Sequence, residues 1–307
     1  MIKPQVSVLM LVYEHQDFVA QAIENVLNQQ CDFQFELLII DDFSTDRSAE
    51  ICRYFAGRYP QTIRFIGNLS NIGMHDSFEK IWNASAANLV AFCEGDDFWI
   101  DRAKLQQQVD LMRQNPHWNL CGAKAQVIEL SSDNEWLITN HIQPVTVQQE
   151  YSFEDLINAY RFHFSTVMLR KQSVVFPDWF KRVYCVDRPI YLLAVENGKA
   201  GYLDSVVSSY RIHSGGNWSS ISSLRKAAQS TDLFLKLAAN FDSKYTERFE
   251  TTLFNILLTY VAIEMTAKRF DNARQIFRLG FSKLNFMNKL RYFIKYFRTA
   301  ILLLLKR

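Results

Sequence analysis

Short apolar runs alternate with amphipathic segments along the first third of the chain. The runs at residues 6–12, 35–40, 62–66 and 89–92 are typical of buried strands, and the segments between them place apolar residues at helical spacing. Strands that are apolar along their whole length and alternate with helices predict a mostly parallel sheet with helices on both faces. We therefore expect an α/β fold, in which Ser44 is the N-cap of the helix after the second strand.

The pattern becomes less regular after the fourth run. Residues 101–112 are expected to form a helix and the polar stretch 131–149 a loop or hairpin. Three further segments are strand-like: residues 120–130, 166–170 and 202–212. After Gly216 only amphipathic helical patterns follow, at residues 224–241, 248–268 and 272–284. This change predicts an α/β domain of residues 1–220 and an all-helical extension of residues 221–307.

Polar side chains collect where the predicted parallel strands end. Tyr13 follows the first run, Asp41 and Asp42 follow the second, and an acidic cluster at residues 94–97 follows the fourth. The carboxyl ends of parallel strands are where such sheets bind ligands. Three carboxylates this close repel one another unless a divalent cation or the donors of a ligand neutralise them. A solvated acidic turn is the alternative, because charged residues are mostly exposed.

Composition describes a globular chain whose charge is segregated. Of its 307 residues, 49% are hydrophobic and 21% are charged, which excludes the disordered and fibrous classes. There are 34 basic and 32 acidic residues, but nine basic and no acidic ones follow position 271, which leaves 25 basic against 32 acidic before it. A basic end on an acidic body favours an anionic surface as partner. Five cysteines without C-x-x-C spacing favour reduced thiols in the cytoplasm.

The basic end has a pattern of its own. Residues 286–305 carry an apolar stripe at helical spacing, flanked by basic side chains. This is typical of helices that lie in a membrane interface, so residues 286–307 are expected to contact a membrane surface. Packing back on the body and formation of a homodimer are the alternatives, and the acidic body disfavours nucleic acid as a partner. No transmembrane helix is expected, because no run of 18 apolar residues occurs.

Several short motifs follow one another in an informative order. Tyr13 comes first, followed by Asp41-Asp42-Phe43-Ser44, Asn71-Ile72-Gly73, Glu94-Gly95-Asp96-Asp97-Phe98-Trp99, Lys104-Leu105-Gln106 and Tyr210-Arg211-Ile212-His213-Ser214-Gly215-Gly216. In this order they resemble the family 2 inverting glycosyltransferases of the GT-A fold, in particular bacterial members of polysaccharide biosynthesis. The resemblance covers about residues 4–218 and does not extend into the helical part.

The resemblance implies a site for a nucleotide-diphosphate sugar and a Mn²⁺ or Mg²⁺ ion. Asp97 matches the family's metal ligand, Asp96 matches a ribose or second metal partner, and His213 matches a further metal ligand. From the residues alone Arg211 and His213 are typical of a surface Arg and a solvated His, but in the context of the resemblance Arg211 is expected to contact the diphosphate. A divalent cation held by carboxylates suits this chemistry, since it offsets the charge that develops on the leaving phosphates.

On the nucleobase side, Tyr13 is expected to stack on a uracil-like base and Asp42 to accept a hydrogen bond from its ring N–H. Asp41 is expected either to contact the nucleotide or to cap the following helix, as Asp often does. The family's usual Asn after the strand-end Tyr is Glu14 in this chain, so that position is given no role.

Inversion requires a general base on the face opposite the leaving group. Asp187 occupies the place of that base by resemblance, although from the residues alone it is more typical of a turn. Members of the family often carry Trp where Arg188 stands, so the adjoining acceptor pocket is left undefined. His163 is expected to be packed or hydrogen-bonded rather than a ligand. Three residues are expected on the acceptor side: Ser165, Thr166 and Trp99.

These features predict a cytoplasmic enzyme, peripheral at the inner face of the membrane. It is expected to transfer sugar from a nucleotide-diphosphate donor, with a UDP-sugar favoured, to a glycan or lipid-linked acceptor. A nucleotidyltransferase with a related sheet is one alternative, disfavoured because no Gly-rich, Lys-bearing phosphate loop lies near the N-terminus. A non-catalytic nucleotide-sugar-binding or scaffold protein is the alternative from another class.

Overall fold

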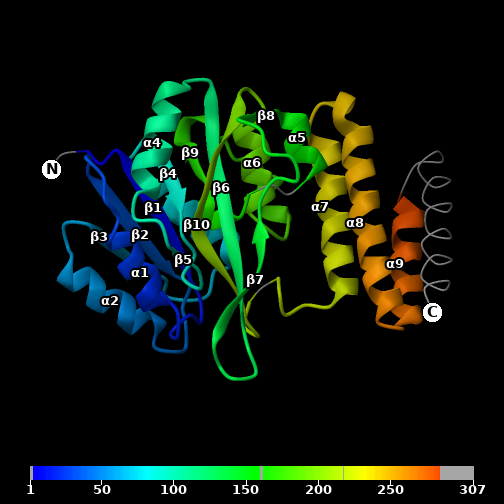
Figure 1. Ribbon diagram of the computed structural model, residues 1–307, viewed down its shortest axis with the longest axis horizontal. Coiled ribbons are helices and arrows are strands. Elements are labelled where there is room, and N and C mark those ends of the chain that lie inside the picture. Colours follow the sequence, from blue (N-terminus) through cyan, green and yellow to red (C-terminus); the bar gives the residue numbers. More distant parts are fainter. Residues whose placement is uncertain (1–2, 160–161, 217, 284–307) are drawn as a thin grey trace. The chain divides into compact units, whose positions relative to one another are not determined.

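The computed structural model describes residues 3–159, 162–216 and 218–283, which form two compact units (Figure 1). Unit 1 contains residues 1–156, 160–181 and 185–216, and unit 2 contains the rest. Unit 1 holds the sheet, and the described part of unit 2 is mainly three long helices. The functional division at residue 220 stays a prediction.

Four parallel strands form the first half of the sheet, in the order β3–β2–β1–β4. They are β1 (Val6–Val12), β2 (Phe35–Asp41), β3 (Ile63–Gly67) and β4 (Leu89–Phe92). Val6 is paired with both Phe35 and Leu89, so β1 is central and buried on both sides. The four apolar runs of the sequence are confirmed as these strands, and their carboxyl ends meet at one edge of the sheet.

The second half of the sheet mixes strand directions, in the order β4–β9–β6–β10–β5. These strands are β9 (Met168–Arg170), β6 (Trp118–Leu130), β10 (Lys199–Ile212) and β5 (Phe98–Trp99), and two more pair at the side: β7 (Trp136–Ile142) on β6 and β8 (Glu150–Tyr151) on β10. The antiparallel pairing of β5 with β10 joins Phe98 to Ser209 and Trp99 to Ser208. This pairing joins the residues just after the acidic cluster to the C-terminal part of β10.

Helices cover both faces of the sheet, as predicted. Apolar side chains of α1 (Val19–Leu27), α2 (Ser48–Arg58) and α4 (Lys104–Gln114) share one core with alternate residues of β1. On the other face, Phe78 of α3 (Met74–Ala84) packs on Phe92, Phe92 stacks on Phe164, and Phe164 contacts Tyr191 of α6 (Asp187–Val195). Five further helices of the described residues are short: α5 (Phe153–Asn158), η1 (Phe164–Thr166), η2 (Lys171–Ser173), η3 (Phe180–Arg182) and η4 (Ser243–Tyr245).

Two local expectations are resolved by the structure. The helix after β2 begins at Ser48, so the prediction of Ser44 as its N-cap was wrong. Ser44 Oγ instead donates to Asp41 Oδ1 at 2.6 Å and accepts from the Glu14 amide at 3.0 Å, while Asp46 Oδ1 accepts from the Ser48 amide at 2.8 Å. The polar stretch after residue 130 is a hairpin, in which β7 pairs with β6.

The described helices of unit 2 are α7 (Ser223–Asn240), α8 (Thr246–Thr266) and α9 (Phe270–Lys283). They confirm the predicted helical patterns, and Phe234 and Phe249 pack between α7 and α8. Glu264 is buried where α8 turns into α9 and accepts from Arg269 Nε at 2.6 Å and Asn272 Nδ2 at 2.9 Å. None of the helices in the described ranges is long and apolar enough to cross a membrane. Residues 286–307, expected to contact a membrane, lie outside the described residues.

Lys104 at the start of α4 is fully buried. Its Nζ donates to Gln108 Oε1 at 2.8 Å and lies 4.1 Å from the centre of the Trp99 ring. The Gln108 amide in turn donates to the carbonyls of Cys121 and Thr166. Burial lowers the pKa of Lys104 to about 7, because an ammonium group loses its hydration in the interior.

We predict that this lysine makes the stability of the protein depend on pH. An unfolded Lys titrates near ~10.4, so between about pH 7 and pH 10 the unfolded chain holds a proton that the folded chain has released, and stability rises with pH. The free energy of unfolding of the wild type, relative to Lys104→Met, should rise by up to ~1.4 kcal/mol per pH unit over that window. Urea unfolding at several pH values measures it. The exposed Lys244→Met is the control, and a Lys104→Met difference equal at pH 7 and pH 10 argues against the prediction.

Candidate active site

The acidic cluster lies on a loop that crosses the carboxyl end of β1. The amide of Cys93 donates to the Leu9 carbonyl at 3.1 Å, and the amide of Gly95 donates to the Leu11 carbonyl at 3.0 Å. A Cβ on Gly95 would lie 2.7 Å from His15 Nδ1, which is closer than side-chain contacts allow. Glycine is therefore required for the loop to lie this deep against β1.

Asp97 is the most deeply buried carboxylate of the loop, with 1% of its surface exposed. Its Oδ1 accepts a hydrogen bond from the Arg211 amide at 3.1 Å. Its Oδ2 is buried without a hydrogen-bond partner, although His163 Nδ1 lies 3.5 Å away. Burial, and then the negative charges of Asp96 and Glu94, raise the pKa of Asp97 well above its ordinary value.

Asp96 faces two imidazole rings. Its Oδ2 lies 3.3 Å from His213 Nε2 and 3.6 Å from His15 Nε2. Burial by itself raises the pKa of Asp96, but the charge of His15 and the hydrogen bond and charge of His213 outweigh it, so the pKa falls to about 2. The structure thus places His213 beside Asp96, and their shared role as metal ligands stays a prediction. Sequence reasoning missed His15, whose signal was its place two residues after Tyr13 at the end of β1.

Glu94 and Asp187 are electrostatically linked. Burial, and then the negative charges of Asp96 and Asp187, together raise the pKa of Glu94 to about 8. Asp187 is partly exposed at the first position of α6, where its carboxylate makes no hydrogen bond or ion pair with the described residues. A carboxylate that is accessible and not engaged elsewhere has the properties of a general base.

Arg211 holds the acidic loop from the β10 side. Its Nη1 donates to the Asp96 carbonyl at 2.6 Å, its Nη2 donates to Gln21 Oε1, and its guanidinium lies over the rings of Phe98 and Phe18 at 4.3 and 5.1 Å. The side chain is buried, and burial lowers its pKa. The guanidinium is thus held by the backbone and the aromatic side chain of the loop, and the predicted contact with a diphosphate stays a prediction.

The residues predicted on the nucleobase side lie at the ends of β1 and β2. Tyr13 is 46% exposed. Asp42 is buried, and its carboxylate accepts from Asn68 Nδ2 at 2.8 Å, from the Ile72 amide at 2.9 Å and from the Gly73 amide at 2.8 Å. Asp41 accepts from both the amide and the hydroxyl of Ser44, so it caps the turn before α2 rather than the helix itself.

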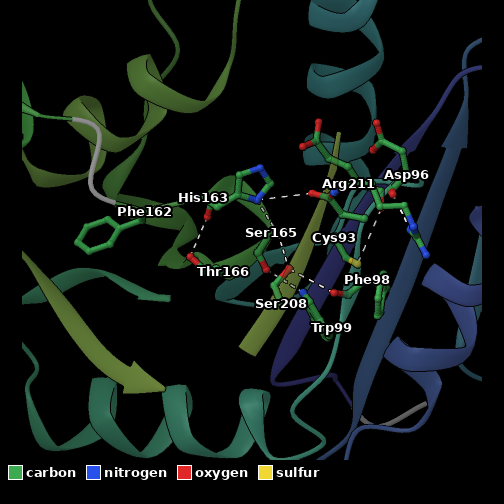
Figure 2. Close-up of polar contacts among 12 residues, drawn as sticks. Cys93, Asp96, Phe98, Trp99, Phe162, His163, Ser165, Thr166, Ser208 and Arg211 are labelled. Atoms are coloured by element: carbon green, nitrogen blue, oxygen red, sulfur yellow. Dashed lines mark hydrogen bonds and ion pairs between the residues drawn. The ribbon is translucent and has the colours of Figure 1, made fainter. Parts of the chain in front are cut away.

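The residues predicted on the acceptor side are all buried: Ser165, Thr166 and Trp99. Trp99 Nε1 donates to the Ser165 carbonyl at 2.7 Å, and Thr166 Oγ1 donates to the His163 carbonyl at 2.8 Å. Ser165 Oγ lies between His163 Nδ1 and Ser208 Oγ, as Figure 2 shows. Their polar atoms bond to groups in the interior, and their predicted place on the acceptor side stays a prediction. The sequence did not reveal this, because a serine or threonine reads as readily as a surface residue.

The acidic loop suits a divalent cation that is held jointly by protein side chains and by a bound substrate. In the described part of the chain, no three His, Cys, Asp or Glu side chains form a complete metal-binding set. However, Asp97 Oδ2 is a buried oxygen without a hydrogen bond, and burial and mutual repulsion raise the pKa of Asp97 and Glu94. Mg²⁺ is commonly held by one or two carboxylates together with substrate phosphates and water. Asp97, Asp96 and His213 could hold a cation in this way.

A family model described as glycosyl transferase family 2 matches residues 7–176, more than half of the chain. The chain belongs to glycosyl transferase family 2. The matched range contains both Asp pairs, at residues 41–42 and 96–97, and the strands that carry them. The resemblance drawn from the motifs is confirmed.

Relatives of this family member occur in several bacteria. An uncharacterised protein of Mycobacterium tuberculosis (strain H37Rv) is 28% identical over 216 residues, which cover 70% of this chain and 60% of the relative. The minor teichoic acid biosynthesis protein GgaA of Bacillus subtilis is 28% identical over 123 residues, which cover 37% of this chain and 26% of that protein. The chain thus spans less than two thirds of the length of these relatives.

Solved structures share the fold at low sequence identity. Staphylococcus aureus TarS 1–349 in complex with UDP-GlcNAc aligns with a TM-score of 0.62 at 14% identity, covering 92% of this chain and 82% of that one. The mannosyltransferase PcManGT of Pyrobaculum calidifontis, in complex with GDP-Man and Mn²⁺, aligns with a TM-score of 0.60 at 12% identity, covering 99% and 85%. The predicted GT-A architecture is confirmed.

We predict that Asp42 stabilises the loop at residues 68–73 through its carboxylate. Asp42→Ala removes the acceptor of the part-buried Ile72 amide and one of the two acceptors of the Gly73 amide, which should lower the free energy of unfolding by about 1–3 kcal/mol. Urea unfolding measures this loss, and hydrogen exchange measures faster exchange of the two amides. The exposed Asp32→Ala is the matched control. Unchanged exchange at both amides in Asp42→Ala would contradict the prediction.

Proposed function

We propose that this protein is a metal-dependent, inverting glycosyltransferase that uses a nucleotide-diphosphate sugar, with a UDP-sugar favoured. The observation that carries the proposal is the buried acidic loop at the carboxyl edge of the sheet, with Asp187 within electrostatic reach of it. Membership of glycosyl transferase family 2 supports sugar transfer as the reaction. The TarS and PcManGT complexes with UDP-GlcNAc and GDP-Man support the class of donor.

On the donor side, Asp97 and Asp96 with His213 would hold the cation, which supplies charge to stabilise the leaving diphosphate. Tyr13, exposed at the end of β1, offers a ring face for the nucleobase. Asp42 fixes the adjoining loop through the Ile72 and Gly73 amides. Arg211 keeps the acidic loop in place, because its guanidinium binds the Asp96 carbonyl.

On the acceptor side, Asp187 would accept the proton of the attacking hydroxyl. Inversion follows when the hydroxyl attacks the anomeric carbon from the face opposite the leaving diphosphate. Asp187 suits this step because the first turn of α6 fixes its backbone while its carboxylate makes no hydrogen bond with the described residues. A growing surface glycan or a lipid-linked glycan is the acceptor class, supported by the name of the teichoic acid relative.

We predict that Asp187→Asn and Asp97→Ala lose activity for different reasons. Asp187→Asn removes the base, so UDP release from a panel of UDP-sugars with Mn²⁺ should fall by roughly 10²–10⁴-fold while UDP binding is unchanged. Asp97→Ala should weaken UDP binding in the presence of Mn²⁺ and lose UDP release as well. Steady-state UDP release and calorimetry measure the two effects.

The exposed Asp178→Asn is the matched control and should behave as the wild type. Normal turnover by Asp187→Asn would overturn its role as the base. Tight nucleotide-sugar binding by the wild type without turnover on any acceptor would indicate a binding or scaffold protein. Release of pyrophosphate from a nucleoside triphosphate would indicate a nucleotidyltransferase.

A peripheral location at the inner face of a membrane is a further part of the proposal, based on the basic amphipathic pattern of residues 286–307. Such a location would bring the site close to a lipid-linked acceptor. We predict that the full chain sediments with anionic liposomes and that a chain ending at residue 283 does not. Because the attraction is largely electrostatic, sedimentation should weaken as salt rises. Equal sedimentation of both chains would rule this part out.

A further inference from the structure

His163 lies beside the acidic loop and was expected to be packed or hydrogen-bonded rather than a ligand. It is 7% exposed and lies one residue before η1, the short helix that carries Ser165 and Thr166. Its Nδ1 lies 3.5 Å from Asp97 Oδ2, the carboxylate oxygen that is buried without a hydrogen bond. The other oxygen of the same carboxylate is fixed by the Arg211 amide at 3.1 Å. One carboxylate is thus approached from two sides, by β10 and by His163.

The orientation of the His163 ring is itself fixed. Nδ1 lies 2.8 Å from Ser165 Oγ, which lies 2.6 Å from Ser208 Oγ, and Ser208 Oγ donates to the Phe98 carbonyl at 3.3 Å (Figure 2). The ring also packs against Tyr210, with ring centres 4.4 Å apart. This chain of contacts begins at Asp97 and returns to the residue after it. A side chain that served only to fill space would not need an imidazole in this place.

We propose that His163 is a positioning residue that sets the orientation of the Asp97 carboxylate for the divalent cation. With Oδ1 bonded to the Arg211 amide and Nδ1 beside Oδ2, rotation of the carboxylate is restricted, and its remaining lone pairs have a fixed direction. Side chains that hold a metal ligand in place affect metal affinity strongly, by about 10–100-fold. The inference rests on the proposed function in one respect, namely that a cation binds at Asp97.

The test compares two substitutions, only one of which keeps a nitrogen at the position of Nδ1. His163→Phe keeps a ring against Tyr210 and removes both nitrogens, whereas His163→Asn places an amide nitrogen near the position of Nδ1. Binding of Mn²⁺ in the presence of UDP, followed by the loss of the free Mn²⁺ signal in electron paramagnetic resonance, should be about 10–100-fold weaker for His163→Phe. It should stay within about threefold of the wild type for His163→Asn.

Kinetics separate positioning from a general loss of structure. For His163→Phe the concentration of Mn²⁺ at half-maximal UDP release should rise, while the rate at saturating Mn²⁺ falls much less. His117→Phe is the matched control, because His117 Nε2 also lies beside a carboxylate, at 2.8 Å from Glu150. His117 directly precedes the first residue of β6 and is not part of the candidate site. It should leave Mn²⁺ binding unchanged.

The outcomes separate this inference from the proposed function. If the wild type binds Mn²⁺ and His163→Phe binds it equally well, the positioning role is overturned and the proposed function stands. If the wild type binds no Mn²⁺ with or without UDP, both the metal requirement and this inference are overturned. Should His163→Phe fail to fold, His163→Gln replaces it, because its amide reaches the position of Nε2 instead. Equal Mn²⁺ affinity of the Gln and Asn variants then overturns the role of Nδ1.

Discussion

Repulsion among three buried or half-buried carboxylates is the constraint on which the rest of unit 1 depends. Glu94, Asp96 and Asp97 are held within four residues of one another, on a loop whose burial raises the pKa of two of them. Charges of one sign in a poorly hydrated place separate unless the backbone prevents it. Here β1 holds the loop from below through two backbone hydrogen bonds, and β10 holds it from the side through β5 and Arg211.

Much of the fold could be predicted, because burial on both faces leaves a direct mark on the sequence. The four parallel strands and the helices of unit 2 have apolar patterns that few other structures would produce. The start of α2 at Ser48 could not be predicted from local signals, since Ser44 is engaged instead by Asp41 and by the Glu14 amide, which lies 30 positions earlier in the sequence. The short strand β5 was missed for a similar reason. Its pairing with β10 joins residues about a hundred positions apart.

The candidate site was predictable where chemistry and position agree, and not where the direction of a side chain matters. Asp96 and His213 come together as the resemblance implied. Ser165 and Trp99 are nearby but face inward, because the hydroxyl and the indole N–H bond to groups inside unit 1. His15 was missed, since a lone His after a strand is more often solvated than paired with a carboxylate.

The close contact of Gly95 with His15 has a consequence for redesign of the site. The loop rests directly on the end of β1, so no side chain can be introduced at position 95 without displacing His15 from Asp96. Position 95 is therefore a poor place to change the shape of the candidate site. The exposed Tyr13 can accept changes without disturbing that part of the loop. Variant libraries that aim to change substrate choice should therefore vary Tyr13 and leave Gly95 unchanged.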